Sequence, residues 1–224
     1  VTVKLSKISI GLTVLLLTAC TAPNYSEPVA PTKIVDGTEI LTINGNVIEV
    51  TEDNVIRVRV PRKGDYIENG IKINKDGVIE VALAAIEVPT KDMPLGDVMH
   101  ETTTALLEGQ DITLEVAQEE LSNTAELIEG YIYVGEESKR IQDILLENGM
   151  AIVDKASPYY DVYSKELERF ETAAKNDQLG VWAFEGFITL SNEFDETFTT
   201  IAHDLEKQAD VIQQKMKENG WTLQ

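Results

Sequence analysis

Cysteine and histidine are almost absent from this sequence. The 224 residues include a single cysteine, Cys20, and two histidines, His100 and His203. One cysteine cannot form an intramolecular disulfide, and two histidines are too few for a histidine-based metal cluster. Both histidines fall in segments whose apolar residues have helical spacing, so we expect ordinary surface or partly buried side chains. Neither a Ser–His–Asp nor a Cys–His catalytic arrangement can be argued from so few candidates.

Basic residues are also scarce. The chain has 19 Lys and Arg against 39 Asp and Glu, which gives a formal net charge of −20 at pH 7. Such a charge repels polyanions, and nucleic-acid binding usually depends on Lys and Arg that displace counterions from phosphates. The composition therefore argues against nucleic acid as a partner unless a local basic groove exists. With 43% hydrophobic residues, the chain is otherwise typical of a globular protein.

The first apolar run of the sequence is too short to span a bilayer. Residues 8–19 are mostly apolar, whereas a membrane-spanning helix needs about 20 such residues. The run follows Lys4 and Lys7, and this is the order of the charged and hydrophobic regions in an export signal. We therefore expect residues 1–19 to be a signal peptide.

The run ends in Leu17-Thr18-Ala19-Cys20, which resembles a bacterial lipobox. In that motif the cysteine thiol is diacylated, and the cysteine becomes the first residue of the mature protein. The resemblance implies a palmitate-type anchor on Cys20 and a location on the extracytoplasmic face of the bacterial cell membrane. Two acyl chains would hold the protein there stably, because one chain binds membranes only marginally. A plain cleaved signal and a buried hydrophobic cysteine are the alternatives.

The segment after Cys20 is expected to connect the anchor to a folded part. Residues 20–32 contain prolines and small polar side chains, which favour a lipidated tether. Residues 33–54 have a β pattern, in which Asn44-Gly45 between alternating apolar residues predicts a hairpin turn. We therefore expect a β-rich N-terminal extension there, with further strands over residues 55–77.

The pattern then alternates between strands and helices. Gly109, Gly149 and Gly180 stand where helices are expected to end, and Ser157 is a candidate helix cap. The expected elements are a strand from residue 78, a helix over 96–108, strands over 111–116 and 129–135, a helix over 138–149 and a helix over 157–180.

From residue 55 to residue 184 the chain resembles the thermonuclease-like, or staphylococcal nuclease, domain. Three strings in the expected order carry the resemblance: Ile86-Glu87-Val88-Pro89-Thr90, Tyr131-Ile132-Tyr133, and LLENGMAIV leading to ERFETAAKNDQLGVW. The resemblance implies an α+β fold, namely a small OB-type barrel of five strands with three helices and a groove on one face. Tyr131, Tyr133 and Trp182 could stack bases in such a groove, but in so acidic a domain we expect them in the core.

Active members of this family cleave phosphodiesters with one Ca²⁺, two acidic ligands, a glutamate that activates water and two arginines. Ca²⁺ takes oxygen ligands, and guanidinium groups neutralise the charge of the transition state. The resemblance places one metal carboxylate at Glu87, beside the Val88 carbonyl, and the other at Asp65. A rival match places the position assigned to Asp65 in the segment around Asp36 instead, where Thr38 would replace the ligand and this carboxylate would be lost.

The other catalytic positions of the family are occupied by residues that cannot do their chemistry. The two arginine positions fall on Ala82 and Leu127, and the glutamate position falls on Thr90. Lys91 and Asp92 follow closely but are not at the family positions. No catalytic residue is therefore assigned, and Ca²⁺ is not required and would bind weakly at Asp65 and Glu87.

Residues 185–224 lie beyond the resemblance and are expected to form a C-terminal helical extension. A single helical face carries their apolar side chains, which are Phe198, Ile201, Leu205, Ile212 and Met216. Gln208 interrupts this seam, which favours packing on the barrel over pairing with another helix in an oligomer.

These features predict a membrane-anchored surface lipoprotein whose thermonuclease-like domain is a catalytically inactive binding or structural module. Its partners would be membrane lipid through Cys20 and a protein or cell-wall component that the sequence does not identify. The alternative is a weak Ca²⁺-dependent nuclease that hydrolyses DNA or RNA. A third reading is an envelope scaffold that uses the C-terminal helix.

Overall fold

The computed structural model describes residues 32–60, 73, 76–117, 127–135 and 139–221. The strands are β1 (Thr32–Val35), β2 (Thr38–Val50), β3 (Ile56–Arg59), β4 (Val78–Leu83), β5 (Ile86–Glu87), β6 (Asp111–Ala117), β7 (Leu127–Val134), β8 (Lys139–Arg140) and β9 (Ile152–Val153). The helices are α2 (Gly96–Leu107), α3 (Ile141–Glu147), α4 (Tyr160–Asn176) and α5 (Ala202–Glu218), with a 3-10 turn at Gly180–Ala183.

Five strands form a closed barrel. The sheet order is β1-β2-β3-β4-β7-β6, and an additional pairing of β2 with β6 closes the ring. Only the β4–β7 pair is parallel among these neighbours. β1 pairs with the start of β2 outside the ring. The α+β barrel predicted from the sequence is confirmed, together with an outer N-terminal strand and a C-terminal helix.

The barrel interior is filled by one side of each strand. In β2, Ile43 and Val47 are buried while Asn44 is exposed, and in β6, Leu114 is buried while Asp111 is exposed. Fully burying a Val or Leu side chain contributes about 1.5–3 kcal/mol each, so this alternation fixes which face of each strand points inward. Outward-facing residues can therefore be read from the strand register.

The hairpin predicted at Asn44-Gly45 is wrong. β2 continues through both residues, because Asn44 pairs with Thr113 and Gly45 pairs with Ile112 of β6. A Cβ at Gly45 would lie 2.5 Å from Cγ1 of Val58, so this glycine allows close strand approach and does not make a turn. β2 is thus a barrel strand, and a domain boundary at residue 55 cuts the barrel.

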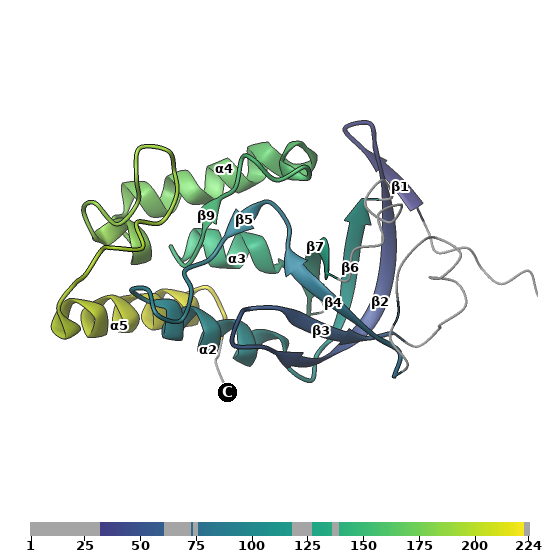
Figure 1. Cartoon of the computed structure of the whole chain (residues 1–224), viewed down its shortest axis with the longest axis horizontal. Coiled ribbons are helices and arrows are strands. Elements are labelled where there is room, and N and C mark those ends of the chain that lie inside the picture. Colours follow the sequence, from purple (N-terminus) through teal and green to yellow (C-terminus); the bar gives the residue numbers. More distant parts are fainter. Residues whose placement is uncertain (1–31, 61–72, 74–75, 118–126, 136–138, 222–224) are drawn as a thin grey trace, which may run out of the picture.

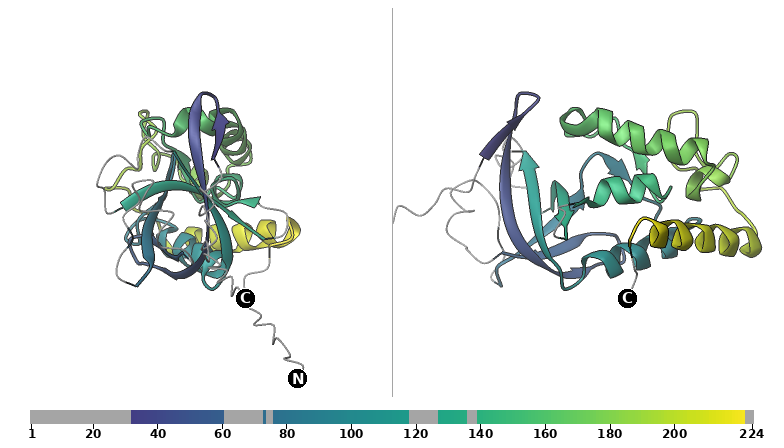
Figure 2. Two further views of the ribbon diagram at one scale, coloured as in Figure 1. Left: turned by 90° about the vertical axis from the view of Figure 1, so that its right-hand side faces the viewer. Right: turned by 180° about the vertical axis from the view of Figure 1, so that it is seen from behind.

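The helices gather at one end of the barrel, and β1 lies toward the other end (Figure 1). The view from behind in Figure 2 shows the same separation. α4 begins at Tyr160, slightly later than the expected cap at Ser157, which accepts a hydrogen bond from the Tyr159 amide. In α5, Ile212 and Met216 are fully buried against the rest of the chain, which confirms intramolecular packing of this helix.

Several predicted features lie outside the described residues. These are the signal peptide, Cys20, most of the tether and the candidate metal ligand Asp65. Among the residues that are described, none of the helices combines the length and the apolar character needed to cross a membrane.

Candidate functional site

The two positions at which the sequence resemblance expects catalytic arginines, Ala82 and Leu127, lie on β4 and β7, the one parallel pair among the barrel strands that the structure describes. Ala82 of β4 pairs with Glu129 of β7, and Leu127 of β7 pairs with Glu80 of β4. Paired residues on neighbouring strands project to the same face of a sheet. The structure thus brings the two positions together, and it places a carboxylate beside each of them. Leu127 is 42% exposed, so an apolar side chain faces solvent where a cation is expected.

Arg57 of β3, whose strand partner is Glu80, already has two carboxylate partners. Arg57 of β3 pairs with Glu80 in the register, and its Nε lies 3.7 Å from Oε1 of Glu80. Its Nη1 donates to Oε2 of Glu49 at 2.6 Å. A phosphate at Leu127 would have to compete with two carboxylates for this cation. Arg57 is therefore a poor substitute for the missing arginine.

Glu87, the expected metal ligand, lies at the end of β5 opposite Ile152 of β9. Partial burial raises the pKa of the Glu87 carboxyl, and the carboxylates of Asp154, Glu193 and Glu196 raise it further. Asp154 is held near by its amide, which donates to the Ala85 carbonyl at 3.0 Å. This surrounding charge favours a cation and opposes a phosphodiester.

The carboxylates near Glu87 do not form a metal cage. Within the described part of the chain, no group of three or more His, Cys, Asp or Glu side chains has a geometry that could hold a metal ion. Ca²⁺ takes six to eight oxygen ligands, so weak binding of Ca²⁺ at Glu87 stays an expectation. Asp65 lies outside the described residues, and the role of Glu87 in metal binding stays a prediction.

On the side of α4, the site is bordered by a hydrogen bond and an ion pair. Ser157 donates from Oγ to Oε2 of Glu129 at 3.0 Å. Lys155 is the cation nearest to Asp154 along the chain, and its Nζ pairs with Oε1 of Glu168 at 2.5 Å. The Tyr160 hydroxyl donates to the same oxygen at 2.6 Å. Lys155 is thus directed to α4 and away from the role of a phosphate ligand.

The loop after Glu87 is joined by an ion pair to the turn between β2 and β3. Thr90 is exposed, and the following Lys91 pairs with Oε1 of Glu52 at 3.1 Å. Glu52, Asp53 and Asn54 form the turn between β2 and β3, so this acidic turn lies beside the Glu87 loop. No local signal would have revealed this contact, because Glu52 and Lys91 are distant in the sequence.

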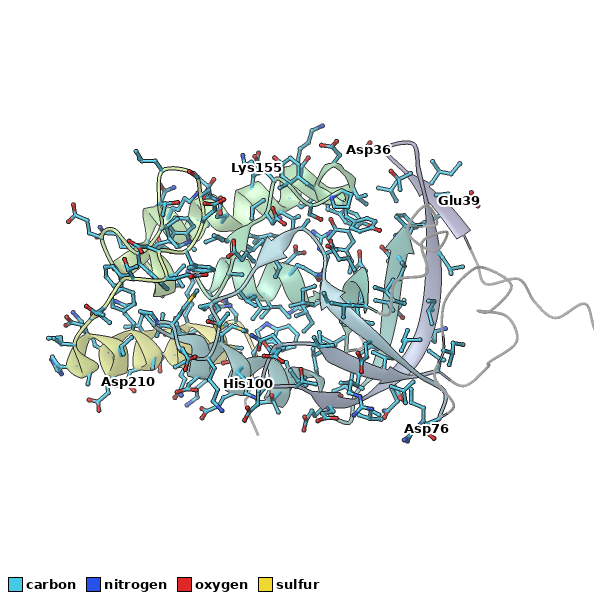
Figure 3. All side chains as sticks on the ribbon, in the orientation of Figure 1. Asp36, Glu39, Asp76, His100, Lys155 and Asp210 are labelled. Carbon is cyan, nitrogen blue, oxygen red and sulfur yellow. The ribbon has the colours of Figure 1, made fainter. Side chains whose placement is uncertain are left out.

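The rival metal position lies on a different part of the fold. Asp36 is at the tip of the β1–β2 hairpin in Figure 3 and has a positive φ of 44°. Thr38 begins β2 and pairs with Val35. Neither residue is on β5 or β9, the two strands that position Glu87.

The histidines are ordinary side chains, and the three aromatic residues expected in the core are buried to different degrees. His100, labelled in Figure 3, is half-buried on α2, and its Nδ1 lies 3.4 Å from Oδ1 of Asn54. His203 is exposed on α5. Tyr131 is buried, and its hydroxyl donates to the Tyr159 carbonyl at 2.7 Å. Tyr133 and Trp182 are partly buried against the core.

Part of the chain matches a known family. Residues 80–184, just under half of the chain, match the family described as staphylococcal nuclease homologue. The match begins within β4 and leaves out β2 and β3, which belong to the same barrel. Comparison with curated proteins gives no significant match.

Proposed function

We propose that the protein uses this barrel, whose residues 80–184 match the family of staphylococcal nuclease homologues, as a binding module without phosphodiester hydrolysis. The module is tethered to the outer face of the cell membrane through Cys20. Its family site has kept a carboxylate and lost the groups that handle phosphate.

The charge at the family site is the observation that carries this proposal. Ala82 and Leu127 occupy the arginine positions, and their strand partners are Glu129 and Glu80. Removing one preorganised electrostatic donor typically costs about 3 kcal/mol of transition-state stabilisation, or a factor of 10²–10³ in rate. With both cations missing, and a carboxylate paired with each of the two positions, the transition state of phosphodiester cleavage is not stabilised.

Membrane anchoring rests on the order of Lys4, Lys7, the apolar run and Cys20. Mass spectrometry of the protein purified from bacterial membranes should show an N-terminal cysteine that carries two or three acyl chains. The Cys20→Ser variant should be recovered without acylation. A mature terminus at any other residue would contradict the proposed anchor.

A nuclease assay tests the catalytic part of the proposal. The purified protein with Ca²⁺ should not cleave single-stranded or double-stranded DNA or RNA above the buffer rate. Chelator-sensitive cleavage that is lost in Glu87→Ala but kept in Glu206→Ala, a control on α5, would overturn the proposal. That result would establish the weak Ca²⁺-dependent nuclease instead.

Calorimetry with Ca²⁺ tests the same site without reference to activity. We expect a dissociation constant of roughly 1 mM or weaker, because the carboxylates that the structure describes around Glu87 do not form a cage. Glu87→Gln should change this weak binding little. A micromolar dissociation constant that disappears in Glu87→Gln would show an intact metal site and would favour the nuclease.

A further inference from the structure

A groove of about 480 Å³ lies on the barrel away from the family site. It crosses β2, β6 and β7, and its volume is in the usual range for small-molecule sites. None of its lining residues belongs to the cluster around Glu87, Ala82 and Leu127. The lining side chains that can bind a ligand are polar or aromatic: Asn44, Asn46, Arg59, Asp111, Thr113 and Tyr133.

Strand register places these side chains in two rows on the outward face of the barrel. In the first row, Asn44 pairs with Thr113, and Thr113 pairs with Tyr133. In the second row, Asn46 pairs with Arg59 on one side and with Asp111 on the other. Their chain neighbours, such as Ile43, Val47 and Ile112, point into the core and are buried. The rows are therefore built on rigid strands.

The side-chain amides of Asn44 and Asn46 are oriented by hydrogen bonds to neighbouring residues. Thr113 Oγ1 donates to Oδ1 of Asn44 at 3.1 Å, which directs the Asn44 Nδ2 outward as a donor. Asn46 Nδ2 donates to Asp111 Oδ1 and to the Gly109 carbonyl, both at 3.1 Å, which leaves the Asn46 Oδ1 as an acceptor. Within the described part of the chain, these two outward atoms make no other hydrogen bond.

Tyr133 supplies an aromatic wall that is held in place. Its hydroxyl donates to Oε2 of Glu115 at 3.1 Å, so the ring is fixed relative to the sheet. The same residue lines a second groove of about 420 Å³, which also includes Lys139 and Trp221. The two grooves therefore meet at one aromatic side chain, which suits a ligand made of repeated units.

We propose that this groove binds a neutral carbohydrate chain, with sugar hydroxyls bonded to Asn44 and Asn46 and a sugar ring packed against Tyr133. Sugars present hydroxyls that both donate and accept, together with an apolar ring face, and the groove offers a partner for each. The charges of Arg59 and Asp111 cancel, so the lining favours neither an anion nor a cation. This inference holds whether or not the family site hydrolyses phosphodiesters, because the two share no residue.

Heteronuclear NMR on the full-length protein, solubilised in detergent, is the direct test. The probes are cellotetraose, chitotetraose and maltotetraose at up to about 10 mM, which detects dissociation constants near 1 mM. At least one probe should shift the backbone amides of β2, β6 and β7 around the groove in a saturable manner. A single-stranded oligonucleotide should leave the same amides unshifted.

Two variants and a matched control locate the site. Asn44→Ala, at an exposed position, should weaken binding roughly threefold to tenfold, the value of one hydrogen bond. Tyr133→Leu should weaken sugar binding by at least about tenfold. The dispersion of the amide signals in the NMR spectrum of this variant shows whether its fold is intact. Asn176→Ala, exposed on α4, should leave affinity unchanged. Absence of shifts with all three sugars, equal affinity in all variants, or a stronger response to the oligonucleotide would overturn the proposal.

Discussion

Gly149 and Gly180 meet backbone to backbone at the junction between α3 and the turn after α4. The Val181 amide donates to the Gly149 carbonyl at 2.8 Å, and both glycines have positive φ, 65° and 60°. A Cβ on Gly180 would lie 2.0 Å from the Gly149 oxygen, and a Cβ on Gly149 would lie 2.2 Å from the Leu179 oxygen. Both positions therefore require glycine for two independent reasons.

We expect Gly149→Ala to destabilise the protein by about 2–4 kcal/mol, because left-handed strain adds to a steric overlap with backbone. Gly109→Ala is the matched control: Gly109 also has a positive φ, of 75°, but no atom lies within 4 Å of an added Cβ. It should lose only about 1 kcal/mol. Urea unfolding measures both changes, and equal losses would contradict the steric part of the argument.

Helices were the part of the fold that the sequence predicted best. The helical spacing and the terminal glycines gave α2, α3 and α4 within a few residues, and the apolar face of the last helix gave α5. These signals are local, since capping and periodicity act within a few turns. Asn44-Gly45 failed for the same reason. Its local preference is for a turn, while pairing with Thr113 and Ile112, distant in sequence, keeps β2 continuous through both residues.

Three tyrosines should resist ionisation. Burial raises the pKa of Tyr163 to about 12, and its hydrogen bond to Glu115 contributes in the same direction. Burial also raises the pKa of Tyr131 and of Tyr133 above the ordinary value. The folded state thus holds these protons more tightly than the unfolded state, in which tyrosine titrates near pH 10.

The stability linked to these tyrosines is fully present below about pH 10 and is lost as the pH rises toward the folded pKa values. For Tyr163 the loss should run from about pH 10 to about pH 12. Urea unfolding across this range should show a falling free energy, and ultraviolet absorbance should show late phenolate formation. Tyr163→Phe should flatten the fall. An identical slope in that variant would show that other groups, such as lysines, cause it.

Glu171 is a buried carboxylate that supports β9 from α4. Its Oε1 accepts the Val153 amide at 2.9 Å, and its Oε2 pairs with Lys175 at 2.7 Å. Glu171→Ala should cost about 1–3 kcal/mol, because it leaves a buried amide without an acceptor. For a chain of this size, that is a fall in Tm of roughly 2–12 °C.

Two further variants separate the backbone bond from the ion pair of Glu171. Glu171→Gln keeps an acceptor for the Val153 amide and should cost less than the alanine variant. Lys175→Ala removes a partner that is 38% exposed and should cost under about 1 kcal/mol. The Tm of thermal unfolding ranks the three variants by their loss of stability. A loss in Lys175→Ala as large as in Glu171→Ala would assign the stabilisation to the ion pair.

The candidate site was predicted only in the positions that a short motif can carry. The string around Glu87 located one carboxylate, but the carboxylates beside it come from distant segments. Glu193 and Glu196 are near because the chain folds back after the last turn of the domain, where Asn192 Nδ2 donates to the Val153 carbonyl at 2.9 Å. No spacing in the sequence signals such a contact. The acidic surroundings of Glu87 are therefore a result of tertiary structure.

Restoring the family residues alone should not restore cleavage. In the triple variant Ala82→Arg, Leu127→Arg, Thr90→Glu, each new guanidinium is paired in the register with a carboxylate, Glu129 or Glu80. Charge-assisted pairing with these neighbours would hold the arginines on the protein and away from a phosphate. Cleavage of single-stranded DNA with Ca²⁺ should stay at the buffer rate.

Adding Glu129→Gln and Glu80→Gln to the triple variant removes both carboxylates, which frees both guanidiniums. This five-fold variant should show a measurable gain in the rate of cleavage. Robust cleavage by the triple variant would show that the local carboxylates do not matter, and failure of the five-fold variant would place the remaining defect at the metal.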